Sequence, residues 1–183
     1  MRSALAELRA LCPDRALPPW DARGVAERQA ARLLRRSGVT HAPVPEEVIS
    51  GLPYVRVRFV KARKLAAAAR WTGGRWSIIV NSDDTLGRQR FSLAHEFKHV
   101  LDHPNANRVY RDRADRSGHA QAERAADCFA AALLMPKAWV KRAFYDHGIR
   151  DDRMLARQFG VSVTAMRFRI NELGLHEPER IAA

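Results

Sequence analysis

The sequence predicts an α+β fold in which a small, mainly antiparallel sheet is followed by a succession of helices. Two observations support this fold class. Residues 54–81 contain short runs that alternate apolar and polar side chains, with the period of two that is typical of β-strands. After residue 85 the apolar side chains recur with the 3.6-residue period of α-helices instead. Strands and helices that are segregated along the chain are typical of an α+β domain.

The first elements follow from local signals. An amphipathic helix over residues 3–11 is followed by prolines, which indicates a loosely packed leader. Asp21 is placed to cap the next helix and Gly38 to end it, and Gly73-Gly74 favours a tight hairpin turn between two strands. The elements expected up to this point are helices at 3–11 and 21–36, a short helix between Pro45 and Gly51, and strands at 54–60, 65–71 and 75–81.

The later elements are helical. The polar segment over residues 103–118, rich in Arg and Asp, is expected to be an exposed loop between two long helices. Pro136 ends the second long helix and can start the next one, because proline is tolerated in a first turn. The expected helices are 86–101, 119–134, 136–146 and a C-terminal pair with its turn at residues 160–162.

The composition is that of a folded protein. The chain has 183 residues, of which 46% are hydrophobic and 28% are charged. These values exclude disorder as the description of the whole chain, and the length allows one domain or one domain with a small appendage. We expect an N-terminal arm (1–19), a core (20–147) and a C-terminal helix pair packed on that core (148–183).

No membrane or secretory segment is expected. The longest charge-free stretch near the middle of the chain, Cys128 to Pro136, has nine residues, whereas a membrane helix needs about 20 apolar ones. Charges at positions 7, 9, 14 and 15 interrupt the N-terminal stretch where a secretory signal needs an apolar core. The two cysteines lie too far apart in sequence to indicate a Cys-based zinc cluster. We therefore expect a cytoplasmic protein with no membrane partner.

The charge balance by itself suggests a nucleic-acid partner. The 32 basic residues outnumber the 20 acidic ones, which gives a net charge of +12. Residues 1–60 contain 10 basic and 6 acidic residues, residues 61–149 contain 16 and 9, and residues 150–183 contain 6 and 5. The excess is thus spread along the chain and is smallest at the C-terminus.

The residues that point to chemistry are His95-Glu96-Phe97-Lys98-His99. On a helix, positions i and i+4 lie on one face, so both imidazoles can bind one metal ion. Zinc suits such a site because it accepts imidazole nitrogen and carboxylate oxygen and leaves one position for water. Glu96, between the two histidines, is placed to act as general base and then as general acid.

A third ligand is needed. An extended HExxHxxGxxH motif is excluded because Asp102 and Asn105 stand where it requires Gly and His. Glu123, on the next long helix, fits the role, and Asp127 four residues later fits that of a carboxylate that orients a ligand histidine. His103 and His119 are rival third ligands, and an exposed Glu123–Asp127 face is the alternative without a metal.

Residues 78–136 carry a resemblance. The segments IIVNSDDTLGRQRFSLAHEFKHVLDH and QAERAADCFAAALLMP resemble the core of the ImmA/IrrE family of zinc metallo-endopeptidases, whose fold is similar to that of the gluzincins. The resemblance implies one zinc ion per chain, ligands His95, His99 and Glu123, and Glu96 as the catalytic base. Relatives often carry Gly at the position of Lys98, so we expect a positive charge near the metal.

The resemblance also implies a role. Members of the family cut helix-turn-helix repressors of the Xre/Cro type and so release genes of mobile elements, stress responses or toxin–antitoxin pairs. A protein substrate of this kind is therefore the expected partner. Two alternatives remain, a metal-stabilised module that binds such a repressor without cutting it, and a DNA-binding regulator.

Two further features of a peptidase can be sought in the sequence. A donor for the oxyanion of the tetrahedral intermediate is needed, and His103 and Tyr110 are the main candidates by position, ahead of His119 and Tyr145. The strand that ends at Val80-Asn81 precedes the metal helix and is a candidate edge for pairing with a substrate peptide.

The C-terminal segment fits the spacing of a helix-turn-helix. Ala156, Gly160 and Met166 occupy the usual small, turn and apolar positions. Arg167 and Arg169 are the basic residues available on its second helix, and the segment has a net charge of only +1. We therefore favour a packing or docking role for this pair over sequence-specific DNA binding.

Overall fold

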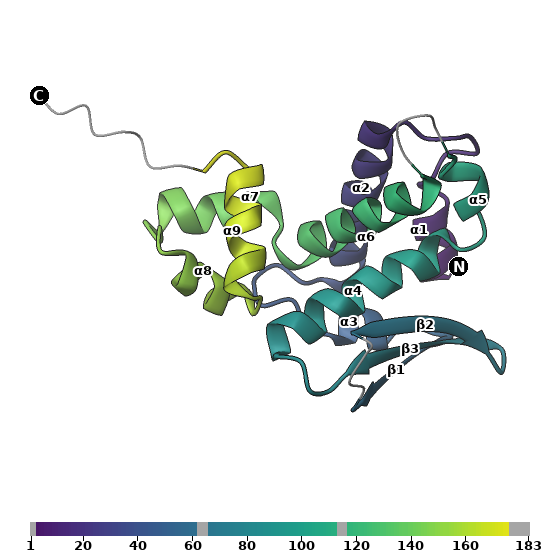
Figure 1. Cartoon of the computed structure of the whole chain (residues 1–183). Helices are drawn as coiled ribbons and strands as arrows, with labels where there is room; N and C mark the ends of the chain where they lie inside the picture. The colour runs from purple at the N-terminus through teal and green to yellow at the C-terminus, as the bar shows by residue number, and fades with distance from the viewer. Residues whose placement is uncertain (1–2, 62–65, 113–116, 176–183) are drawn as a thin grey trace, which may run out of the picture.

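The computed structural model describes residues 3–61, 66–112 and 117–175, and it confirms the α+β class. One helix packs on a three-stranded sheet, a second long helix packs on the first, and a third long helix packs on the second. Figure 1 shows these layers, with the C-terminal helices beside them. The helices that form the layers beyond the sheet are, in this order, α4 (Leu86–Asp102), α6 (Gly118–Leu134) and α2 (Pro19–Ser37).

The sheet is mixed, which corrects the expectation of a mainly antiparallel one. Its strands are β1 (Val55–Val60), β2 (Ala67–Thr72) and β3 (Arg75–Asn81), in the order β1-β3-β2. β2 and β3 form the predicted antiparallel hairpin through Gly73 and Gly74, whose φ angles are 56° and 75°. Because the hairpin occupies one side of β3, β1 pairs with the other side, and there it runs parallel.

The side chains of β3 point alternately into the core and to the opposite face of the sheet. Trp76, Ile78 and Val80 are buried on the side of α4, so the alternate residues point the other way. β1 follows the expected pattern at Val55, which is buried. Phe59 was expected on the same buried face, but it is 42% exposed, since it lies near the end of an edge strand.

The N-terminal segment is packed, which corrects the expectation of a loose leader. α1 (Ala4–Arg9) buries Leu8 completely, and Leu17 further along is also buried. The Arg9 side chain donates hydrogen bonds to the carbonyls of Val100 and Leu101 near the end of α4. The segment thus stabilises the helix that carries the histidine motif.

The start of α2 differs from the prediction, and its end agrees. Pro18 stands at the N-cap, so Asp21 does not cap the helix and forms an ion pair with Arg15 instead. Gly38 ends the helix with a φ of 67°. The short helix expected after Pro45 is α3 (Glu47–Ser50), which packs against β1.

The segment between α4 and α6 is not simply an exposed loop. It contains the short helix α5 (Ala106–Val109), and both Val109 and Tyr110 are buried. The surrounding polar residues concealed this short apolar pair in the sequence. Part of the expected loop, residues 113–116, lies outside the described residues.

The C-terminal helices begin after Pro136 and rest on the core. Gly160 ends the first helix of the predicted pair with a φ of 64°, and Ser162 caps the second. A Cβ on Gly87 at the start of α4 would lie 2.6 Å from the carbonyl carbon of Val161, so the turn of the pair touches α4 directly. The helical segments are α7 (Lys137–Lys141), its π-helical continuation η1 (Arg142–Asp146), α8 (Asp152–Phe159) and α9 (Val163–Glu172).

The arginines considered for DNA contact are engaged within this pair. Arg169 is buried, donates to the carbonyl of Met135 and forms an ion pair with Glu172. Arg167 forms an ion pair with Asp152. The buried contacts of Arg169 support packing as its role, whereas Arg167, whose side chain is 61% exposed, is held by a surface ion pair. In the part of the chain that the structure describes, no helix is long and apolar enough to cross a membrane.

Candidate metal centre

Three side chains from two helices converge at the surface between α4 and α6. His95 and His99 are one turn apart on α4, and their Nε2 atoms are 3.1 Å apart. The carboxylate of Glu123, on α6, lies 3.3 Å from Nε2 of His95 and 3.2 Å from Nε2 of His99. Within the described residues these three form the group whose ligand atoms lie close enough to hold one metal ion.

The spacing of these atoms fits a metal site. In a tetrahedral site with bonds of about 2.0–2.1 Å, neighbouring ligand atoms lie about 3.3–3.4 Å apart. The distance between the two Nε2 atoms is close to this value, and each Nε2 atom lies at a similar distance from a different oxygen of the Glu123 carboxylate. Two imidazole nitrogens that face each other at this range need a cation or proton between them. Neutral imidazole and carboxylate are the donors that zinc accepts.

Asp127 lies behind this group. Its Oδ1 atom is 2.9 Å from Nδ1 of His95, so the Nε2 atom of that ring is left to face His99 and Glu123. Burial lowers the pKa of His95, but the hydrogen bond and charge of Asp127 outweigh it, so the pKa is raised. Burial and the charge of His95 lower the pKa of His99.

Glu96 projects from α4 toward strand β2. The backbone N–H of Ala69 donates a hydrogen bond to its carboxylate. Burial raises the pKa of Glu96, and the opposing charge of His95 offsets this only in part. A carboxyl group whose pKa is raised toward neutrality is suited to accept and return a proton.

The open edge of the sheet beside Glu96 belongs to β2, which corrects the expectation that the last strand would form it. Asn81 donates to the carbonyl of Ala66, so these two residues are a hydrogen-bonded pair of the β2–β3 ladder. Such pairs alternate with non-bonded ones along an antiparallel ladder. Ala67, Ala69 and Trp71 therefore direct their backbone N–H and C=O groups away from β3, toward solvent and Glu96.

The rival ligands lie elsewhere. His119 is one turn before Glu123 on α6, with a side chain that is 84% exposed and a ring nitrogen 3.8 Å from the Glu123 carboxylate. His103 stands at the end of α4 and packs its ring against Trp76 at 4.9 Å. Neither joins the group of three that the described residues form.

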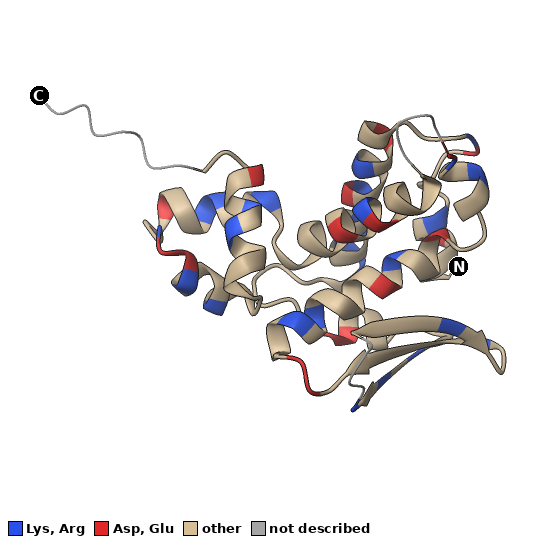
Figure 2. Cartoon of the chain, in the orientation of Figure 1, with Lys and Arg blue, Asp and Glu red and all other residues tan. Residues whose placement is uncertain are grey.

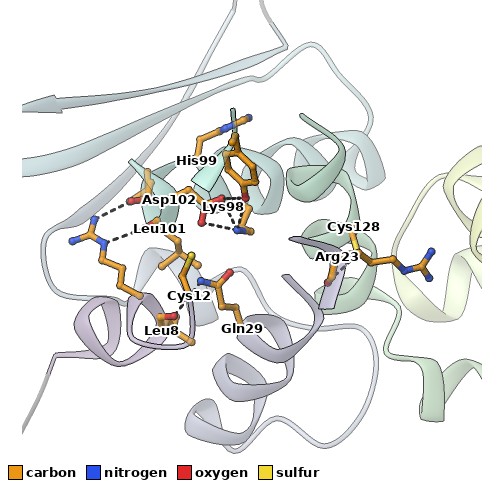
Figure 3. A network of polar contacts seen from close by, with 12 residues as sticks. Leu8, Cys12, Arg23, Gln29, Lys98, His99, Leu101, Asp102 and Cys128 are labelled. Atoms are coloured by element: carbon orange, nitrogen blue, oxygen red, sulfur yellow. Dashed lines mark hydrogen bonds and ion pairs between the residues drawn. The ribbon is translucent and has the colours of Figure 1, made fainter. Parts of the chain in front are cut away.

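Lys98 and Tyr110 belong to a second cluster, on the buried side of α4. The Lys98 ammonium is completely buried and pairs with both carboxylate oxygens of Asp102, and Tyr110 donates its hydroxyl to the same carboxylate. Figure 3 shows Lys98 joined to Asp102 in this network. We call Lys98, Asp102 and Tyr110 the lysine cluster.

The lysine cluster corrects two expectations. The positive charge of Lys98 does not stand free near the metal, because Asp102 neutralises it. Tyr110 does not serve as an oxyanion donor, because its hydroxyl is committed to Asp102 inside the protein. Burial raises the pKa of Tyr110, and the charge of Asp102 raises it further.

The comparisons with known proteins agree with this geometry. A family model described as the IrrE N-terminal-like domain, of the Peptidase M78 family, matches residues 39–171. The chain belongs to this family. The resemblance predicted from residues 78–136 is thereby confirmed, and the family is one of metallopeptidases. None of the curated proteins matches the chain.

A solved structure also resembles this one. It is described as a Mycobacterium tuberculosis transcriptional regulator, and it matches over 91% of this chain and 52% of its own, with a TM-score of 0.62 and 19% identity. At this identity the likeness shows a shared fold. The chain thus spans about half the length of that regulator.

Sequence reasoning missed two components of the site. The backbone N–H of Ala69 carries no signal in a sequence, because its position depends on which strand lies at the edge of the sheet. The lysine cluster had a signal, since Lys98 and Asp102 have the i, i+4 spacing of a helical ion pair. Its burial depends on α1 and the segment around Tyr110, which lie against that side of α4.

Proposed function

We propose that this chain is a zinc-dependent endopeptidase. The observation that carries the proposal is the convergence of His95, His99 and Glu123 at a spacing that can hold one metal ion, with the proton acceptor Glu96 beside them. His95, His99 and Glu123 would hold one zinc ion per chain. Zinc supplies Lewis acidity, which activates a water molecule and polarises the peptide carbonyl.

Glu96 performs the proton transfers. Its carboxylate takes the proton of the attacking water and returns it to the leaving amide nitrogen, so that the new amine departs neutral. Asp127 orients His95 by accepting a hydrogen bond from Nδ1, which keeps Nε2 directed at the centre. His103, one turn beyond His99, remains the proposed donor to the oxyanion.

The substrate peptide binds in an extended conformation along the open edge of β2. The outward N–H and C=O groups of Ala67 and Trp71 offer backbone pairing to such a strand, and Ala69 between them contacts Glu96. A scissile bond paired with this edge lies over Glu96 and the two histidines. Trp71, which is exposed, adds apolar surface beside the paired strand.

We propose that the substrate is a cytoplasmic helix-turn-helix repressor of the Xre/Cro type and that its cleavage releases the repressed genes. Family membership supports this role, and the similar solved structure is described as a transcriptional regulator. The test is co-expression with the repressor encoded next to this gene, with wild type and Glu96→Gln in parallel. Wild type is expected to yield a truncated repressor and Glu96→Gln an intact one.

The controls separate the alternatives. Glu96→Gln is expected to retain zinc and to co-purify with the intact repressor, because the substitution removes only the proton acceptor. A module that binds without cutting would leave the repressor intact with both proteins. Promoter binding that is lost in Arg167→Ala/Arg169→Ala would instead support the DNA-binding regulator, against the internal contacts of both arginines.

A further inference from the structure

The face of the sheet opposite α4 is open and basic. Because Val55, Trp76 and Ile78 point toward the helices, the alternate residues of each strand point to the opposite side. Arg56 and Arg58 on β1 lie on that side, opposite Ser77 and Ile79 of β3. The arginines of this face, which we call the basic face, are Arg56, Arg58, Arg70 and Arg75.

The charge of the chain is concentrated in the segment that builds this sheet. Residues 48–82 contain seven basic residues and no acidic residue, so this segment has a net charge of 7 − 0 = +7. The other residues contain 25 basic and 20 acidic side chains, which leaves 25 − 20 = +5. Figure 2 shows the strands with blue segments and no red ones. More than half of the net charge thus lies in fewer than a fifth of the residues.

The basic face has no partner in the part of the chain that the structure describes. All four of its arginines are exposed, and none forms an ion pair with a described carboxylate. On α2, by contrast, three of the five exposed arginines, Arg23, Arg32 and Arg36, each pair with a glutamate. Like charges on one sheet face repel, so this arrangement costs stability unless an anion is bound.

The spacing and residue types indicate what kind of anion. Arg56 and Arg58 are about 7 Å apart along β1, and Arg70 lies two strands away at about 10 Å, so the charges form an extended array suited to a polyanion. All four side chains are arginines, which bind phosphates with paired N–H donors and stack on nucleobases. Tyr54, immediately before β1, is 65% exposed and has a φ of 67°, an uncommon conformation for a bulky residue.

We propose that the basic face binds single-stranded nucleic acid. The arginines contact the phosphodiester backbone, and Tyr54 stacks on one unpaired base. A flat sheet face projects no helix or ribbon into a major groove, so the unpaired form is bound in preference to the duplex. This surface is independent of the metal centre and of α9, whose arginines are engaged elsewhere.

The test is the fluorescence anisotropy of a labelled oligothymidylate or oligouridylate of about 20 nucleotides, which is longer than typical site sizes of about 4–16. For the zinc-loaded full chain, we expect binding whose affinity falls with salt. In Arg56→Gln/Arg58→Gln/Arg70→Gln, binding is expected to weaken at least about tenfold, and the logarithmic salt slope to fall by about 2, since each lost phosphate contact removes about 0.7. Tyr54→Ala is expected to weaken binding about fivefold or more with an unchanged salt slope, because it removes a stacking contact.

A matched variant distinguishes the basic face from net charge. Arg28→Gln/Arg35→Gln/Arg142→Gln removes the same charge from exposed arginines on α2 and η1, and it is expected to bind nearly as wild type does. Four results would overturn the proposal: no binding by wild type at low salt, an equal loss in the matched variant, tighter binding of a duplex of the same length, or equal competition by polyglutamate of the same charge. The last of these would assign the face to an acidic protein.

Discussion

Helix α4 carries two polar clusters on opposite sides, and they differ in what completes them. The lysine cluster is complete by itself, because the ammonium of Lys98 is neutralised by Asp102 and Tyr110 satisfies the same carboxylate. The group of His95, His99 and Glu123 is incomplete without a cation, because its nitrogen and oxygen acceptors converge on a common point.

This difference indicates that the lysine cluster has a structural role and that the histidine group binds a cation. A buried ion pair that satisfies itself leaves no group free to bind a ligand, whereas converging acceptors at a surface require a cation. The same helix turn supplies both, since Lys98 and His99 are adjacent on α4 and belong to different clusters. Each prediction below changes one cluster and measures both.

The largest effect on the metal centre is expected from His99→Ala, which should abolish zinc binding. Wild type should gain about 2.7 kcal/mol of stability at a zinc concentration 100 times its Kd, because zinc binds only the folded protein. The variant should show no zinc-dependent shift in Tm, because only two of the three ligands remain. Its stability without metal should stay close to that of wild type. Calorimetric unfolding with and without zinc measures this. An undiminished zinc shift in the variant would remove His99 from the centre.

Lys98→Met should have the largest effect on stability. It leaves Asp102 buried without its cation, so we expect a loss of about 3–5 kcal/mol in the free energy of unfolding. Zinc stoichiometry should remain one per chain in the folded fraction. Urea unfolding measures the loss, and elemental analysis measures the zinc.

A matched double variant checks the cause of that loss. Lys98→Met/Asp102→Leu removes both charges and should recover part of the stability, because a buried pair can be replaced by apolar residues at little cost. The rest stays lost because the buried Tyr110 hydroxyl no longer has its partners. A double variant as unstable as Lys98→Met would show that the loss comes from packing and not from an unpaired carboxylate.

Asp127→Asn should have a smaller effect, confined to the metal centre. It weakens the hydrogen bond that orients His95, so zinc affinity should fall about 10- to 100-fold. Competition with a chromophoric chelator measures the affinity, and stability without metal should change little because the Asp127 side chain is 60% exposed. Unaltered affinity would mean that His95 is oriented by other contacts.

Tyr110→Phe should have the smallest effect, confined to the lysine cluster. Asp102 loses one hydrogen bond but keeps Lys98, so we expect a loss of about 2 kcal/mol. Zinc affinity and proteolysis should be unchanged, because the hydroxyl is buried away from the centre. A large drop in proteolysis at unchanged stability would return Tyr110 to the role of oxyanion donor.

The parts of the fold that could be predicted from the sequence are those with local causes. The helices around His95 and Glu123 follow from apolar periodicity within each segment. The order of the strands does not, because β1 pairs with a strand that comes after β2 in sequence. The burial of Leu8 and Tyr110 also depends on contacts with distant elements, so the N-terminal segment and the expected loop were misjudged.

The site shows the same division. His95, Glu96, His99, Glu123 and Asp127 could be proposed because helical spacing places them without knowledge of the rest. The contact of Glu96 with β2 depends on which strand lies at the edge. The basic segment 48–82 can be read from the sequence, but its placement on one open face of the sheet depends on the pairing of the strands.

The most direct test of the central claim is zinc-edge X-ray absorption of the zinc-loaded protein. The account predicts nitrogen and oxygen ligands alone at about 2.0–2.1 Å, with the multiple scattering of two imidazoles. His95→Ala should lose this signature, and Lys98→Met should retain it. Sulfur at about 2.3 Å, or a spectrum without imidazole, would contradict the assignment of the metal centre to His95, His99 and Glu123.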